Sequence, residues 1–93
     1  MNTEEQEYYS IEVCYLDNID SDLDFSLMKS IPEMLSEFNN LEAEWYFSES
    51  YLGEPSHRIM GFGLNRPLDY LERRELHLHL NFDYNGKVFI ISY

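Results

Sequence analysis

An alternating run near the carboxyl end of the sequence constrains the fold most. Residues 75–84 alternate between polar and apolar side chains, the apolar ones being Leu76, Leu78, Leu80 and Phe82. This is the period of a half-buried β-strand. Asn85-Gly86 follows, the favoured dipeptide of a two-residue hairpin turn, and the apolar segment Lys87–Tyr93 comes next. Because such a turn sets the apolar positions of both segments opposite one another, the pattern predicts a β-hairpin over residues 75–93.

Three further segments have the composition of strands. Residues Tyr8–Leu16 alternate with period two, and their inward set is Tyr9, Ile11, Val13 and Tyr15. Residues Glu42–Tyr51 alternate in the same way, with Ala43, Trp45 and Phe47 expected to point inward. Residues Arg58–Leu64 form a third strand, in which Gly61 and Gly63 predict a bulge or a close backbone approach.

One segment has the period of a helix. Between Leu23 and Phe38 the apolar residues lie three or four apart and form one face. Pro32 interrupts this face and lacks the N–H group of an interior helical position. Ser30 and Glu33 have the spacing of a capping box. We therefore expect either a kinked helix or a short turn followed by a helix from Ile31, ended by Asn39-Asn40.

These elements predict one α+β domain. The order is β-α-β-β-β-β, which gives an antiparallel sheet of about five strands with one helix packed on one face. Residues 1–7 are expected to form a flexible acidic tail and residues 8–93 the single domain. The other face of the sheet is left for solvent or for a partner.

Composition excludes several classes of protein. The acidic start, Met1–Glu7, is unlike a secretory signal, and no apolar run approaches the ~20 residues of a membrane span. A single cysteine, Cys14, cannot form an internal disulfide, which favours the reducing cytosol. Direct binding of nucleic acid is disfavoured because phosphate contacts need Lys and Arg, and the chain has 6 of these against 18 Asp and Glu.

The negative charge is concentrated in the first part of the chain. Residues 1–54 contain 14 acids and one base, a net charge of −13, whereas residues 55–93 contain four acids and five bases, a net charge of +1. The total of −12 exceeds the ~2–8 charges that keep a small domain soluble. Because excess charge makes a folded chain repel itself, we interpret the acidic surface as a binding surface for a basic partner.

Acidic residues and nearby tyrosines are the candidate partner-binding residues. Carboxylates steer a cationic partner toward the surface, and tyrosine is enriched among residues that dominate binding energy. Tyr70 and Tyr84 are further aromatic candidates. The predicted binding residues are Asp17, Asp20, Asp22, Asp24, Glu42, Glu44, Tyr46, Glu49, Tyr51 and Glu54.

No motif identifies a reaction, a metal or a cofactor. His77 and His79 lie two apart on the predicted strand face and could share a metal, but the spacing indicates no further ligand. Cys14, mid-strand among apolar residues, is expected to be a buried and inert thiol. Asp20, Asp22 and Asp24 approach a calcium loop, but Ile31 stands where such a loop has its last ligand. We therefore expect a protein that is not an enzyme.

The leading hypothesis is a small cytosolic inhibitor that occludes a basic, nucleic-acid-handling protein, as an immunity protein neutralises a nuclease toxin. A first alternative is a phage-type mimic of DNA that blocks a restriction or CRISPR nuclease. A second alternative is an oligomerising scaffold subunit that uses the uncovered sheet face or the edge of Lys87–Tyr93. The chain itself is expected to be a monomer or a weak homodimer.

Overall fold

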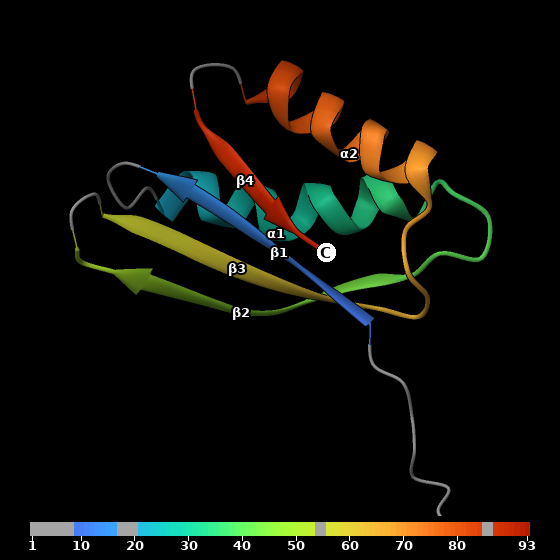
Figure 1. Ribbon diagram of the computed structural model, residues 1–93, viewed down its shortest axis with the longest axis horizontal. Coiled ribbons are helices and arrows are strands. Elements are labelled where there is room, and N and C mark those ends of the chain that lie inside the picture. Colours follow the sequence, from blue (N-terminus) through green and yellow to red (C-terminus); the bar gives the residue numbers. More distant parts are fainter. Residues whose placement is uncertain (1–8, 17–20, 54–55, 85–86) are drawn as a thin grey trace, which may run out of the picture.

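The described chain forms four strands and two helices, with a helix after β1 and another after β3. The computed structural model describes residues 9–16, 21–53, 56–84 and 87–93. In chain order the elements are β1 (Tyr9–Leu16), α1 (Ser21–Leu35), β2 (Ala43–Tyr51), β3 (His57–Leu64), α2 (Tyr70–Asp83) and β4 (Phe89–Ser92) (Figure 1). The fold is therefore α+β as predicted, but with four strands and two helices in place of about five strands and one helix. The predicted tail and the Asn85-Gly86 turn lie outside the described residues.

The four strands form one antiparallel sheet in the order β2-β3-β1-β4. Ile11 of β1 lies opposite Phe62 of β3, and Cys14 of β1 lies opposite Ile90 of β4. Each helix joins two strands that run parallel and have one other strand between them. This is the split βαβ arrangement of ferredoxin-like folds, and it places β2 and β4 at the two edges of the sheet.

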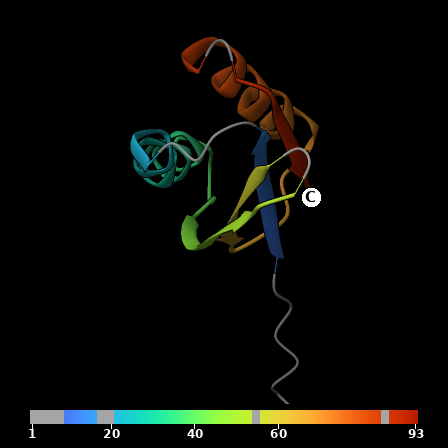
Figure 2. The ribbon, with the colours of Figure 1, turned by 90° about the vertical axis from the view of Figure 1, so that its left-hand side faces the viewer.

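The core lies between one face of the sheet and both helices. Ile11, Val13 and Tyr15 of β1 are buried against Leu27 of α1 and Leu76 of α2, within a single apolar cluster. Figure 2 shows both helices on the same side of the twisted sheet. Since the second helix packs on the same face as the first, no described helix or strand covers the opposite face of the sheet.

Helix α1 follows the predicted apolar period but differs at its middle and its end. Leu27, Ile31 and Leu35 are fully buried at intervals of one turn. Pro32 lies inside the helix, so Ser30 and Glu33 do not begin a second helix there. The helix ends at Leu35, and the chain turns through Asn40, which adopts the left-handed conformation with a φ of 59°.

The predicted strand over residues 75–84 is wrong, because this segment belongs to helix α2. The helix begins after Asp69, whose side chain accepts a hydrogen bond from the Glu72 N–H, while the Glu72 side chain accepts one from the Asp69 N–H. The sequence suggests a loop or a single helical turn over Leu68–Arg74, whereas this capping box starts α2 within that segment. Leu76 and Leu80, one turn apart, are buried, whereas Phe82 is 76% exposed. The predicted hairpin is therefore absent, and β4 pairs with β1 instead.

A bulge in β2 changes which side chains reach the core. Ala43 and Trp45 pack against the core as predicted. The register then shifts at Tyr46, so that Phe47 lies opposite Gly61 on the uncovered side of the sheet. The predicted inward position of Phe47 is therefore wrong. The approach at the β3 glycines is made by side chains and not, as predicted, by a backbone, because a Cβ on Gly61 would overlap the ring of Phe47.

Candidate binding face

The uncovered side of the sheet, called here the open face, gathers residues from all four strands. The register of the three strand pairs places these side chains on the side opposite the helices. Strand β1 contributes Glu12, Cys14 and Leu16, and strand β3 contributes His57 and Ile59 next to its two glycines. The remaining members, from β2 and β4, are Glu44, Tyr46, Phe47, Glu49, Tyr51 and Ile90.

Aromatic rings line the β2 side of the open face. A Cβ on Gly63 would overlap the ring of Tyr46, just as one on Gly61 would overlap Phe47. Glycine at these two positions therefore lets the rings rest against the β3 backbone. Farther along, the ring of Tyr51 stacks on His57, with centroids 5.0 Å apart and an interplanar angle of 13°. Tyr46 is 60% exposed, so the row of rings is accessible to a partner.

Three carboxylates share this face with the rings. Glu12, Glu44 and Glu49 are all exposed. Glu49 accepts a hydrogen bond of 2.7 Å from the Tyr51 hydroxyl, and this bond together with the Glu49 charge raises the pKa of Tyr51. The four strands contain one Lys or Arg, Arg58. It lies opposite Tyr15 on the covered side of the sheet, so the described open face has carboxylates without a Lys or Arg side chain.

Cys14 lies on the open face and not in the core. Its side chain is half-buried, at the register position between Ile59 and Ile90. Burial, and to a smaller extent the charge of Glu12, raise the pKa of the thiol. A raised pKa lowers the thiolate fraction at neutral pH and so lowers nucleophilicity. Cys14 was expected to be buried, and it is instead half-buried on the open face. The raised pKa of its thiol supports the expected low reactivity.

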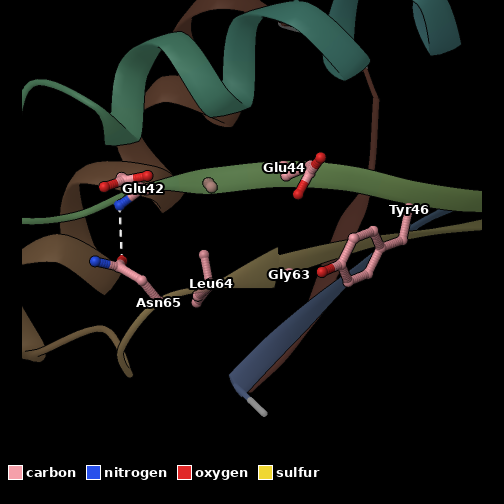
Figure 3. Close-up of a pocket in the computed structure, with 7 residues that line it drawn as sticks. Glu42, Glu44, Tyr46, Gly63, Leu64 and Asn65 are labelled. Carbon is pink, nitrogen blue, oxygen red and sulfur yellow. Dashed lines mark hydrogen bonds between the residues drawn. The ribbon is translucent and has the colours of Figure 1, made fainter.

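A shallow hollow of about 500 Å³ opens beside the β2 rings. Figure 3 shows Glu42, just before β2, and Glu44 on β2 above it, with the Tyr46 ring directed toward Gly63 on β3. Asn65 closes the end of the hollow, because its side-chain oxygen accepts a hydrogen bond of 2.7 Å from the Glu42 N–H. Two carboxylates and one ring therefore border a space large enough for a side chain of a partner.

The structure brings together part of the predicted site. Glu44, Tyr46, Glu49 and Tyr51 lie on the open face, and Glu42 lines the hollow beside it. Asp22 is exposed in the first turn of α1, on the covered side of the sheet. Three other predicted residues lie outside the described part of the chain: Asp17, Asp20 and Glu54.

Asp24 is buried inside the molecule and is not available to a partner. It is 7% exposed and forms an ion pair with Arg58. Its second oxygen accepts a hydrogen bond of 2.6 Å from the Tyr15 hydroxyl, and Arg58 also donates to Ser50. This carboxylate holds the start of α1 against β1 and β3, which is a structural role.

Sequence reasoning missed Glu12, Phe47 and His57 as members of the face. Glu12 could have been predicted, because the alternation of residues 8–16 already places it on the outward side of its strand. Phe47 reaches the face only through the bulge at Tyr46. His57 joins it through its stack on Tyr51, which depends on the pairing of β2 with β3.

The two histidines of the alternating run do not face one another. His77 is exposed near Tyr93, whereas His79 lies between the helices. Positions two apart on a helix point in different directions, so the predicted strand face that joined them is absent. Within residues 9–16, 21–53, 56–84 and 87–93, no group of three His, Cys, Asp or Glu side chains is placed to hold a metal ion.

Ser30, His79 and Asp83 form a chain with the order of a catalytic triad. His79 Nδ1 lies 2.6 Å from Asp83, and its Nε2 lies 3.2 Å from Ser30 Oγ. However, Ser30 lies inside α1, where backbone N–H groups are used by the helix and supply no oxyanion site. The nearby hollow is lined by His79 but not by Ser30. The Tyr84 hydroxyl lies 2.7 Å from Ser30 Oγ, and we interpret the whole chain as a link between the two helices.

Comparison of this chain with protein-family models, with curated proteins and with solved structures finds no match in any of the three. Among the described residues, no helix has the length and apolar composition needed to cross a membrane. The chemistry of the open face is therefore the basis on which a function can be proposed.

Proposed function

We propose that this protein is a non-catalytic inhibitor that covers a cationic surface of a nucleic-acid-handling protein, as an immunity protein neutralises a nuclease toxin. The open face is the proposed contact surface. One observation supports this most directly: Glu12, Glu44 and Glu49 share an uncovered sheet face with exposed rings and with no described Lys or Arg. The proposal places the protein in the cytosol, where an unpaired cysteine stays reduced.

The chemistry of the face suits arginine and lysine side chains of a partner. Carboxylates form charge-assisted hydrogen bonds with both, and arginine can bind bidentately. Tyr46 and Tyr51 add ring surfaces that attract a cation by about 0.5–2 kcal/mol each. The net charge of −12 steers a basic partner toward the molecule from a distance. The same features complement the phosphate-binding surface of a nucleic-acid-binding protein, because such a surface is rich in lysine and arginine.

The arrangement along β2 favours the immunity-type proposal over a DNA mimic. A mimic needs carboxylates in an uninterrupted row that resembles a phosphate backbone. From Glu42 to the end of β2 the outward side chains are two acids, then two rings, then an acid and a ring: Glu42, Glu44, Tyr46, Phe47, Glu49 and Tyr51. Interleaved rings suit a protein surface with both charge and apolar anchors.

Two variants of equal charge test the proposal. The first changes Glu12, Glu44 and Glu49 to Gln. The second changes three exposed acids of α1 and the turn that follows it, Asp22→Asn, Glu33→Gln and Glu37→Gln. Each variant has a net charge of −12 + 3 = −9. The full chain is used as bait in pull-downs at ~0.05 M and ~0.5 M salt, with a fluorescent deca-arginine peptide as a defined probe in parallel.

We expect wild type to capture a basic partner at low salt and to release it at high salt. The open-face variant should weaken binding of the partner and of the peptide at least about tenfold, or about 1.4 kcal/mol, while the α1 variant stays within about threefold of wild type. Equal losses in both variants would show that net charge and not the open face governs binding. A captured partner that is acidic, or that is unaffected by the open-face variant, contradicts the proposal.

A further inference from the structure

The two edges of the sheet differ in how they are protected. Strand β2 has nine residues, a bulge at Tyr46, and the charged side chains Glu44 and Glu49. Bulges and charges are the devices by which proteins prevent the pairing of an exposed edge with another chain. Strand β4 has neither: the segment from Val88 to Tyr93 has no charged side chain and no bulge in its pairing with β1.

The β4 edge is also apolar and accessible. Val88 is 58% exposed and Ile90 is 53% exposed. Strand β4 is the last strand of the sheet and pairs with β1 alone among the described strands, so its other edge presents unpaired backbone groups. Cys14 and Ile59 continue the apolar surface next to Ile90 across the open face. An unprotected edge beside an apolar surface is the pattern of a strand that pairs with another strand.

We propose that β4 pairs antiparallel with β4 of a second copy of this chain, across a two-fold axis, to form a continuous eight-stranded sheet. An isologous contact of this kind needs one self-complementary segment, which an uncharged strand supplies. Strand β4 has four residues, so the ladder is short and the dimer forms at high micromolar concentrations.

Of the pairings that the two sheet edges allow, β4 with β4 has the least charge repulsion because of the strand order. Each copy carries a net charge of −12, and β2 with its glutamates lies three strands away from β4. At about 4.8 Å per strand, the two β2 strands of the dimer are about 34 Å apart. The two Glu12 side chains, on β1, are about 14 Å apart. Both distances exceed the Debye length of about 8 Å at physiological salt.

The dimer would also present two open faces together. A two-fold axis between antiparallel strands is perpendicular to the sheet, so both open faces lie on the same side. This consequence rests on the proposed function, because it gives a basic partner two anionic faces in one plane. The pairing itself is independent of it and is tested without a partner.

Sedimentation velocity of the full chain from about 5 µM to 1 mM, at 0.15 M and 0.5 M NaCl, tests the pairing. We expect the mass to rise from 11.2 kDa toward twice that value, and to rise further at high salt. Ile90→Lys should raise the dissociation constant at least about tenfold. The matched control is Phe25→Lys on α1, where the side chain is 70% exposed, and it should dimerise like wild type.

Hydrogen exchange gives a second measurement that does not depend on a substitution. In the dimer, amides of Phe89–Ser92 should gain protection as the concentration rises, while amides of β2 do not. A mass of 11.2 kDa at every concentration overturns the proposal. So does a dimer that Ile90→Lys leaves intact, or protection that appears on β2 instead of β4.

Discussion

Asp24 illustrates how a single residue changes role between sequence and structure. In the sequence it is one of several aspartates before a helix, and it was grouped with the partner-binding acids. In the structure it pairs with Arg58 and accepts a hydrogen bond from Tyr15. The pairing joins positions 34 residues apart, so no local pattern distinguishes Asp24 from its exposed neighbour Asp22. The burial of a charge requires such a partner.

Asp24→Asn should therefore lower the free energy of unfolding by about 2–4 kcal/mol, because it leaves the Arg58 charge without its counter-charge. The Arg58 side chain retains 20% exposure, so some of the loss is recovered by water. Urea unfolding at pH 7 measures the change. Asp22→Asn, two residues away and exposed, is the control and should cost no more than about 1 kcal/mol. Similar losses in both variants would contradict the structural role of Asp24.

Tyr46 shows how one inserted residue limits prediction of the site. The alternation of residues 42–51 correctly placed Ala43 and Trp45 inward and Glu44 outward. After the bulge every later side chain changes face, because the side-chain period of a strand is two. Gly61 and Gly63 signalled a close approach but not the strand that makes it. The alternation therefore predicted the outward positions of Glu44 and Tyr46, whereas those of Phe47, Glu49, Tyr51 and His57 needed the register.

At the level of elements, helix α2 shows why the alternating run was misinterpreted. Leu76 and Leu80 satisfy both a period of two and a spacing of one helical turn. Leu78 and Phe82, which complete the strand pattern, are half-buried and exposed in the helix. The sequence did contain the deciding signal, since Asp69 and Glu72 have the spacing of a capping box. The other elements, β1, α1, β2 and β3, lie within a few residues of their predicted bounds.

The start of α2 predicts a pH dependence of stability. Glu72 accepts two hydrogen bonds from Arg66, of 2.8 and 2.7 Å. These bonds, supported by the Asp69 N–H, lower the pKa of Glu72 against the opposing effect of burial. A folded-state pKa below the unfolded value stabilises the fold at pH above the unfolded pKa, here 4.5. That contribution is lost as the pH falls through the folded-state pKa.

Glu72→Gln should cost about 1–2 kcal/mol at pH 7, and its difference from wild type should shrink as the pH is lowered from 5 to about 3. Urea unfolding across this range measures both changes. Glu33→Gln, an exposed acid on α1, serves as the control and should keep the wild-type dependence. A Glu72→Gln deficit that stays constant with pH would show that the ion pair does not contribute this linkage.

At the scale of the whole molecule, the net charge of −12 opposes folding. Among the described residues Asp24 pairs with Arg58 and Glu72 with Arg66, while the Asp83 carboxylate contacts the His79 ring within α2. Most of the basic side chains are thus on the helices and loops, while the open face stays anionic. Concentrating like charge on one face raises the energy of the folded state and prepares that face for a cationic surface.

Salt should therefore stabilise the isolated protein. Raising NaCl from about 0.01 M to 0.5 M reduces the Debye length from about 30 Å to below 10 Å. We expect a gain of about 1 kcal/mol, or a rise in melting temperature of about 4–8 °C for a domain of this size. Thermal unfolding followed by circular dichroism measures it. Both triple variants, with a net charge of −9, should gain less than wild type. A melting temperature that falls with salt would contradict this account of the charge.

The central position of β1 has a consequence for the order of folding. Strand β1 is made first, yet one of its two neighbours is β4, formed by Phe89–Ser92. Pairing β1 with β4 closes a longer loop of chain than pairing β1 with β3, so we expect β1, β2 and β3 with α1 to assemble first and β4 to join last. Until β4 joins, one side of β1 stays open to other unfolded chains, and the yield of native protein should fall as the protein concentration during refolding rises.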